Sequence, residues 1–187
     1  MKNIILIIAS GFILLGCTVK TQTDIDPYVT LHKNEKQNIQ INFLGVNDKR
    51  TTSIASKIIN DGEVQSEYPL NVDVKKWYTE AFLREFENAK ISINEQDSNM
   101  SVLVNIQNID AQYEKYSLNS KNMQAKVKIE IIITKGIKTT TSNIVSNQTV
   151  YKPMILDAEG FESILNESMQ SSVSKSVRVI IQKSKGL

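Results

Sequence analysis

The sequence predicts an α+β domain of two layers, with two helices packed on one face of an antiparallel sheet of four to six strands. Apolar residues alternate with polar ones in several runs, as in half-buried strands, and recur every three or four positions in two longer runs, as in amphipathic helices. The resulting order is strand, hairpin, helix, three strands, helix. Runs of strands followed by helices favour this architecture over the alternating units of a parallel sheet.

The first half begins with a strand and a hairpin. Apolar side chains occupy every second position from 39 to 43, and Gly45 with the polar residues after it is expected to end this strand. Residues 53–59 and 63–68 flank an Asp61-Gly62 pair. Asp-Gly readily supplies the positive φ angles of a tight turn, so these two runs predict a hairpin.

Two segments have helical periodicity. Residues 72 to about 90 follow a helix cap at Asn71 or Asp73, and Asp157 caps a second helix that runs to about Lys183. Aromatic residues at helical spacing could line a ligand pocket, but they more often form core. We therefore interpret those of the first helix as core: Trp77, Tyr78, Phe82 and Phe86.

Three strands separate the helices. Apolar residues occupy the even positions from 100 to 106 and the odd positions from Ile109 onward. This one-residue slip would exchange the buried and exposed faces of the strand unless a β-bulge absorbed it, so we predict a bulge at Gln107-Asn108. Residues 125–133 alternate most clearly, and the β-branched run 137–151 is expected to pair with them.

The N-terminus has the pattern of a secretory signal. Lys2 precedes an apolar run of about 12 residues that ends at Leu15, which is shorter than the roughly 20 residues that span a bilayer. The motif Leu14-Leu15-Gly16-Cys17 resembles a lipobox, with cleavage between Gly16 and Cys17 and acyl chains on Cys17. A buried thiol in an uncleaved anchor helix is the alternative. Cys17 is the chain's one cysteine, so no disulfide competes for it.

These signals divide the chain into three parts. Residues 1–16 are interpreted as a lipoprotein signal peptide, 17–37 as a lipidated N-terminus and polar tether with a short extended piece at 28–31, and 38–187 as a single globular domain. Thr18, rather than aspartate, follows the cysteine. This favours an outer-membrane anchor that faces the periplasm of a Gram-negative bacterium.

The charge and motif content argues against several functions. The signal peptide removes only Lys2 from 22 basic and 20 acidic residues, so the mature chain is nearly neutral and nucleic-acid binding is not expected. The sequence has no glycine-rich phosphate motif or metal-binding histidine pattern, and its one histidine, His32, lies in the expected tether. We therefore predict no catalytic residues, metal or cofactor, and no enzyme activity.

Two places are candidates for a partner surface. Asp48 and Arg50 lie in the turn after the first strand, where they form either a contact site or a capped turn. Tyr113 and Tyr116 follow the expected bulge, and an exposed tyrosine pair there would suit a protein interface.

The chain resembles the YajG family of bacterial lipoproteins. The residues that carry this resemblance are the lipobox, the Pro27-Tyr28-Val29-Thr30-Leu31 piece and the Asn47-Asp48-Lys49-Arg50-Thr51 turn, in the same order of elements over nearly the whole mature chain. The resemblance implies an outer-membrane lipoprotein, and the family has no settled activity to transfer. The layout also looks like auxiliary lipoproteins of envelope lipid-transport and lipopolysaccharide-assembly machines, which is a likeness of fold only.

Two functions remain open from the sequence. The first is a non-enzymatic interaction or accessory module, anchored through Cys17 and bound to one or more envelope proteins. The alternative is a lipid or glycolipid carrier, in which the helices lift from the sheet to line an apolar cavity. A hydrolase is disfavoured because one histidine and an acylated cysteine cannot supply the usual nucleophile and base.

Overall fold

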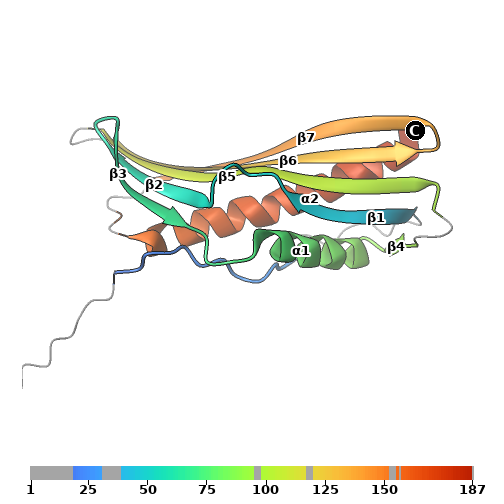
Figure 1. The fold of residues 1–187 in the computed structure, drawn as a ribbon, viewed down its shortest axis with the longest axis horizontal. Coiled ribbons are helices and arrows are strands. Elements are labelled where there is room, and N and C mark those ends of the chain that lie inside the picture. Colours follow the sequence, from blue (N-terminus) through green and yellow to red (C-terminus); the bar gives the residue numbers. More distant parts are fainter. Residues whose placement is uncertain are drawn as a thin grey trace, which may run out of the picture.

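The computed structural model shows a sheet that curves over a layer of helices (Figure 1). It describes residues 19–30, 39–94, 98–116, 120–151, 155 and 157–186, with the backbone alone at 115, 116, 120 and 121. The expected signal peptide, Cys17 and His32 lie outside the described residues.

The described part contains seven strands, two α-helices and one turn of 3₁₀ helix. The strands are β1 (Ile39–Asp48), β2 (Ile54–Asn60), β3 (Glu63–Pro69), β4 (Ile91–Ile93), β5 (Met100–Tyr116), β6 (Ser120–Lys135) and β7 (Lys138–Tyr151). The helices are α1 (Val74–Asn88), η1 (Ala158–Phe161) and α2 (Glu162–Gly186).

The sheet is mixed, so the expectation of a purely antiparallel sheet with four to six strands is wrong. The long central strand β5 pairs in parallel first with β1 and then with β2 on one side, and antiparallel with β6 on the other. β7 follows β6, β3 follows β2, and β4 runs parallel to β1. Helix α1 lies in the chain between β1–β3 and β4–β5, and a crossover of this kind brings strands back in parallel.

Register shifts along both sides of β5 shape the sheet. The register between β5 and β6 shifts between Ile106 and Asn108, which confirms the predicted bulge and returns Ile109 to the helix side of the sheet. A second shift lies between Phe43 and Gly45, whose φ of 99° is the left-handed conformation that glycine adopts most easily. β1 therefore continues through Gly45 to Asp48, so the expectation that Gly45 begins the end of this strand is wrong.

The core lies between the sheet and the helices. The ring of Phe82 is buried among those of Tyr78, Phe86 and Phe43, with centroids 5.8–6.5 Å apart, so the α1 aromatics are core as predicted. The predicted caps are present as well. The Asp73 Oδ1 accepts from the Lys76 N–H at 3.0 Å. Asp157 accepts from the Glu159 N–H at 3.2 Å and so caps η1, the 3₁₀ turn that leads into α2 at Glu162.

Candidate functional site

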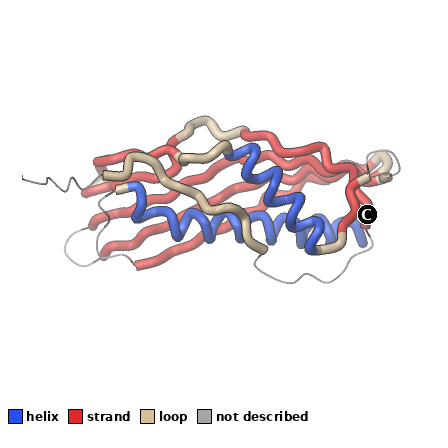
Figure 2. The backbone as a smooth tube through the Cα atoms, turned by 90° about the horizontal axis from the view of Figure 1, so that it is seen from below, coloured by secondary structure: helices blue, strands red, loops and turns tan. Residues whose placement is uncertain are grey.

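Residues 19–30 lie bound over the helical layer as an extended segment, called here the docked segment (Figure 2). Thr23 forms a parallel bridge with Leu70 at the end of β3. Its N–H donates to the Pro69 carbonyl at 2.9 Å, and its carbonyl accepts from the Asn71 N–H at 2.8 Å. The buried Thr23 hydroxyl lies 3.0 Å from that of Ser56 on β2. These contacts attach the segment to the sheet.

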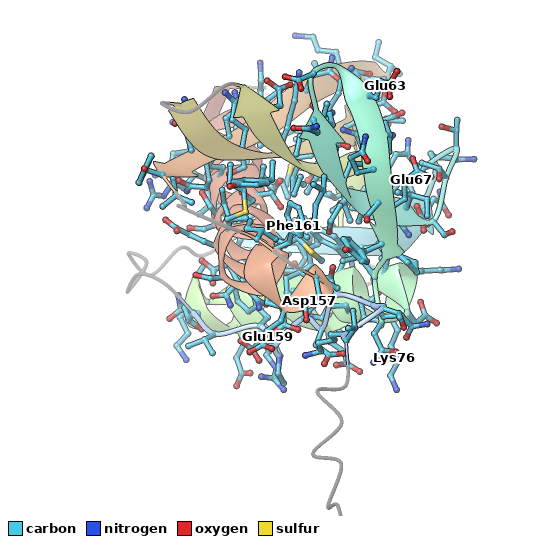
Figure 3. The ribbon with its side chains drawn as sticks, turned by 90° about the vertical axis from the view of Figure 1, so that its left-hand side faces the viewer. Glu63, Glu67, Lys76, Asp157, Glu159 and Phe161 are labelled. Atoms are coloured by element: carbon cyan, nitrogen blue, oxygen red, sulfur yellow. The ribbon has the colours of Figure 1, made fainter. Side chains whose placement is uncertain are left out.

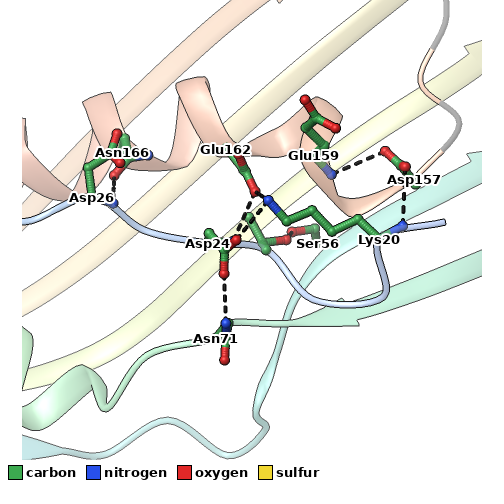
Figure 4. A network of polar contacts seen from close by, with 10 residues as sticks. Lys20, Asp24, Asp26, Ser56, Asn71, Asp157, Glu159, Glu162 and Asn166 are labelled. Carbon is green, nitrogen blue, oxygen red and sulfur yellow. Dashed lines mark hydrogen bonds and ion pairs between the residues drawn. The ribbon is translucent and has the colours of Figure 1, made fainter. Parts of the chain in front are cut away.

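Polar contacts attach the same segment to the start of α2 (Figure 4). Lys20 forms ion pairs with Glu162 and, at 2.7 Å, with Asp24. The hydrogen bonds to these two carboxylates raise the pKa of Lys20 above its ordinary value, and the bond from Lys20 lowers the pKa of Asp24. Further along, the Asp26 N–H donates to the Asn166 Oδ1 at 2.8 Å. The contacts thus span about one turn at the start of α2, from Glu162 to Asn166.

Tyr28 attaches the far end of the docked segment to α1. Its ring lies edge-on to Trp77 with centroids 6.1 Å apart, and its hydroxyl donates to the buried Glu85 Oε2 at 2.6 Å. Burial, followed by this hydrogen bond, raises the pKa of the Tyr28 phenol. Trp77 Nε1 donates to the Asp26 carbonyl at 2.8 Å, and Arg84 Nη1 donates to the Tyr28 carbonyl at 3.1 Å.

The tether expected over 17–37 is therefore wrong for residues 19–30, which belong to the folded domain. Only Thr18 separates Cys17 from Val19, and two Cα–Cα steps span at most about 8 Å. The docked segment thus begins two residues after the expected lipidation site, Cys17, at the end of the domain where the Lys20 N–H donates to Asp157 at 3.3 Å. Figure 3 looks onto this end of the molecule, where Asp157 and Glu159 lie near each other and Glu63, Glu67 and Lys76 lie further apart.

The first predicted partner site, Asp48 and Arg50, is an intramolecular ion pair. Arg50 Nη2 donates to the Asp48 Oδ2 at 2.8 Å and Arg50 Nε to Oδ1 at 3.0 Å. The pair lies where β1 leaves β5 and before β2 joins it. Arg50 Nη1 is buried and has no hydrogen-bond partner among the described residues. The hydrogen bonds between Asp48 and Arg50 stabilise the loop between β1 and β2. Whether these two residues also contact a partner protein stays a prediction.

Replacing Arg50 with alanine is expected to lower the free energy of unfolding by about 0.2–1 kcal/mol at neutral pH. Burial raises the pKa of Asp48, but the Arg50 hydrogen bonds outweigh it, so the pKa lies below its ordinary value. A depressed carboxyl pKa adds stability above the unfolded pKa of about 4, and this stability is lost as the pH falls through the folded pKa. Urea unfolding at pH 7 and pH 3 measures the effect, with Lys49→Ala as the control. A loss that is equal at both pH values would contradict the assignment.

The second predicted partner site is not an exposed tyrosine pair. Tyr113 is only 2% exposed and faces the helices, because the bulge at Gln107 places it in phase with Ile109 and Ala111. The side chain of Tyr116 lies outside the described residues. The tyrosine surface expected from the sequence is thus wrong for Tyr113.

The hollows in the described surface are polar and open. One of about 820 Å³ lies at the end of the molecule that carries the C-terminus of α2, and most of its lining residues are polar, among them Lys90, Lys135 and Lys185. Another of about 510 Å³ lies on the sheet face opposite the helices, between Asp110 and Asn147. Within the described ranges, no group of three His, Cys, Asp or Glu residues could hold a metal ion.

None of the helices in the described ranges is long and apolar enough to cross a membrane.

Solved structures share the fold at low sequence identity. Protein XCC0632 from Xanthomonas campestris, of the DUF330 family, has a TM-score of 0.54 at 12% identity, over 90% of this chain and 95% of that one. A second structure, an uncharacterized protein, has a TM-score of 0.51 at 5% identity, over 86% and 98% of the two chains. These likenesses concern the fold alone. None of the curated proteins compared with the chain matches it.

A family model described as "Uncharacterized lipoprotein" matches residues 27–177. The match begins within the docked segment and ends in α2, so it covers every strand and most of both helices. The chain therefore belongs to this family of uncharacterized lipoproteins.

Proposed function

We propose that the protein is a YajG-type lipoprotein of the Gram-negative outer membrane, anchored through Cys17, that serves a periplasmic envelope complex as a non-enzymatic interaction module. The docked segment is the observation that carries this proposal. Its bonds to β3, α1 and α2 leave only Thr18 between the proposed lipid site and the folded domain. A short link of this kind holds the domain at the membrane surface, where an accessory component of an envelope complex would work.

The proposal favours protein partners over a lipid cargo. A lipid carrier needs an apolar cavity between helices and sheet, and large side chains fill that layer. The fully buried ones include Phe82, Phe161, Ile131 and Met123. Opening a cavity there would separate a close-packed interior, which costs free energy for every side chain exposed. The accessible features of the described surface include polar hollows and a strand edge.

In-cell crosslinking followed by mass spectrometry tests the proposal. The full-length protein is compared with Cys17→Ala, which is expected to lose its anchor and with it the crosslinked envelope partners. Lys76→Ala is a matched control, because Lys76 is exposed on α1 and its side chain makes no ion pair among the described residues. The proposal would be contradicted if the anchored protein captured no partner while native mass spectrometry found lipid bound within the soluble form.

A further inference from the structure

Strand β7 is a long and regular edge of the sheet. Its 14 residues pair with β6 from Lys138 to Tyr151 without any register shift. On its other side no described strand pairs with it, and Figure 1 shows it as the outermost strand beyond β6. The edge therefore offers a continuous row of backbone donors and acceptors.

The turn between β6 and β7 identifies which backbone groups are free. Gly136, with φ of 60°, and Ile137 form the two-residue loop that Lys135 and Lys138 close. Hydrogen-bonded and non-hydrogen-bonded pairs alternate from this closing pair, so even-numbered residues bond to β6 and odd-numbered residues from 139 to 149 point outward. Lys175 Nζ supports this assignment, since it contacts the outward Val145 carbonyl at 3.5 Å.

Strand β7 itself carries few of the features that usually prevent strand pairing, although Lys175 of α2 contacts its edge at the Val145 carbonyl. From Thr139 to Tyr151 the strand has no charged residue, proline, glycine or bulge. The opposite border of the sheet is protected, because β3 carries Glu63 and Glu67 and ends at Pro69, and β4 is only three residues long. Of the borders of the described sheet, β7 is therefore the one where an added strand would meet the fewest obstacles.

The side chains of β7 match a second copy of themselves. About a two-fold axis through Ile144, the helix-side residues would pair as Ile144 with Ile144 of the second copy, Ser142 with Ser146, and Thr140 with Gln148. The residues on the opposite face would pair Thr139 with Thr149. None of these β7 residues is charged, so their side chains bring no like charges together, and only Lys175 of each copy would have to turn away from the edge. In this register the outward backbone groups of both strands face each other as hydrogen-bonded pairs.

We propose that β7 pairs antiparallel with β7 of a second copy of this chain, so that the two sheets become one continuous sheet in a symmetric dimer. This proposal goes beyond the interaction module proposed above. It does not depend on the anchor, so the Cys17→Ala form should dimerise even if it captures no envelope partner. An incoming N–H would replace the long contact of Lys175 with the Val145 carbonyl.

Oxidative crosslinking of the full-length membrane-bound protein tests the axis. Residues opposite each other in a non-hydrogen-bonded pair have Cα atoms about 4.5 Å apart, within disulfide range. Ile144→Cys should therefore form a disulfide-linked dimer. Thr139→Cys is the control, because position 139 would lie opposite 149 and about 33 Å from its own equivalent. The one native cysteine, Cys17, is common to both variants.

A backbone substitution tests the pairing without a crosslinker. The Asn143 N–H points to the free edge, so Asn143→Pro should preserve the β6 ladder and the circular-dichroism spectrum while it shifts the protein from dimer to monomer in light scattering. Asn143→Ala keeps the N–H and should remain a dimer. A monomeric wild-type protein at tens of micromolar would overturn the proposal. So would crosslinking of Ile144→Cys to a different protein, or a dimer that persists in Asn143→Pro.

Discussion

Replacing Phe82 with alanine is expected to lower the free energy of unfolding by about 3–5 kcal/mol. Phe82 is fully buried and its ring contacts Phe43 of β1 as well as Tyr78 and Phe86 of α1. Truncation removes the contacts of the Phe82 ring with these three aromatic rings and leaves a cavity between α1 and the sheet. Urea unfolding monitored by circular dichroism measures the loss.

Leu83→Ala is the matched control for this substitution. Leu83 is the next residue of α1 but is 42% exposed, so its truncation should cost less than about 1 kcal/mol. If both variants lost the same stability, the assignment of Phe82 to the central core would be wrong.

Tyr28→Ala is expected to lower the free energy of unfolding by about 3 kcal/mol and to release the docked segment from α1. The substitution removes a buried ring that contacts Trp77 and a hydroxyl that donates to Glu85. Trypsin cleavage after Lys20, whose ion pairs depend on the segment staying bound, should become faster. Proteolysis followed by mass spectrometry measures the cleavage rate.

Tyr28→Phe separates the contribution of the ring from that of the hydroxyl. The phenylalanine keeps the contact with Trp77 and loses one buried hydrogen bond, which should cost about 1–2 kcal/mol with little change in cleavage at Lys20. Equal cleavage rates in the wild-type protein and Tyr28→Ala would show that Tyr28 does not hold the segment.

The local features of the fold could be predicted from the sequence. Alternation revealed the paths of β5 and β6, the change of phase at Ile109 revealed the bulge, and Asp73 and Asp157 marked the helix starts. The neighbours of β5 could not be predicted, because parallel pairing with β1 and β2 joins residues far apart in the sequence. β4 has three residues, too few for an alternating pattern.

The docked segment was missed for a related reason. Its polar residues show no helical or strand period, and their partners lie far along the chain, as with Lys20 and Glu162 or Tyr28 and Glu85. A polar run next to a signal sequence looks like a tether until those partners are placed. Tyr113 differs, because its phase with Ile109 and Ala111 already indicated the buried face.

Hydrogen exchange on the full-length, membrane-bound protein tests the central claim most directly. The amides of Thr23 and Asp26, which donate to the Pro69 carbonyl and the Asn166 side chain, should be protected to a degree similar to the amides of α2. Protection there means that the domain begins beside the proposed lipid site. Exchange of both amides at the rate of an unstructured chain would contradict this account, because residues 19–30 would then be a free tether.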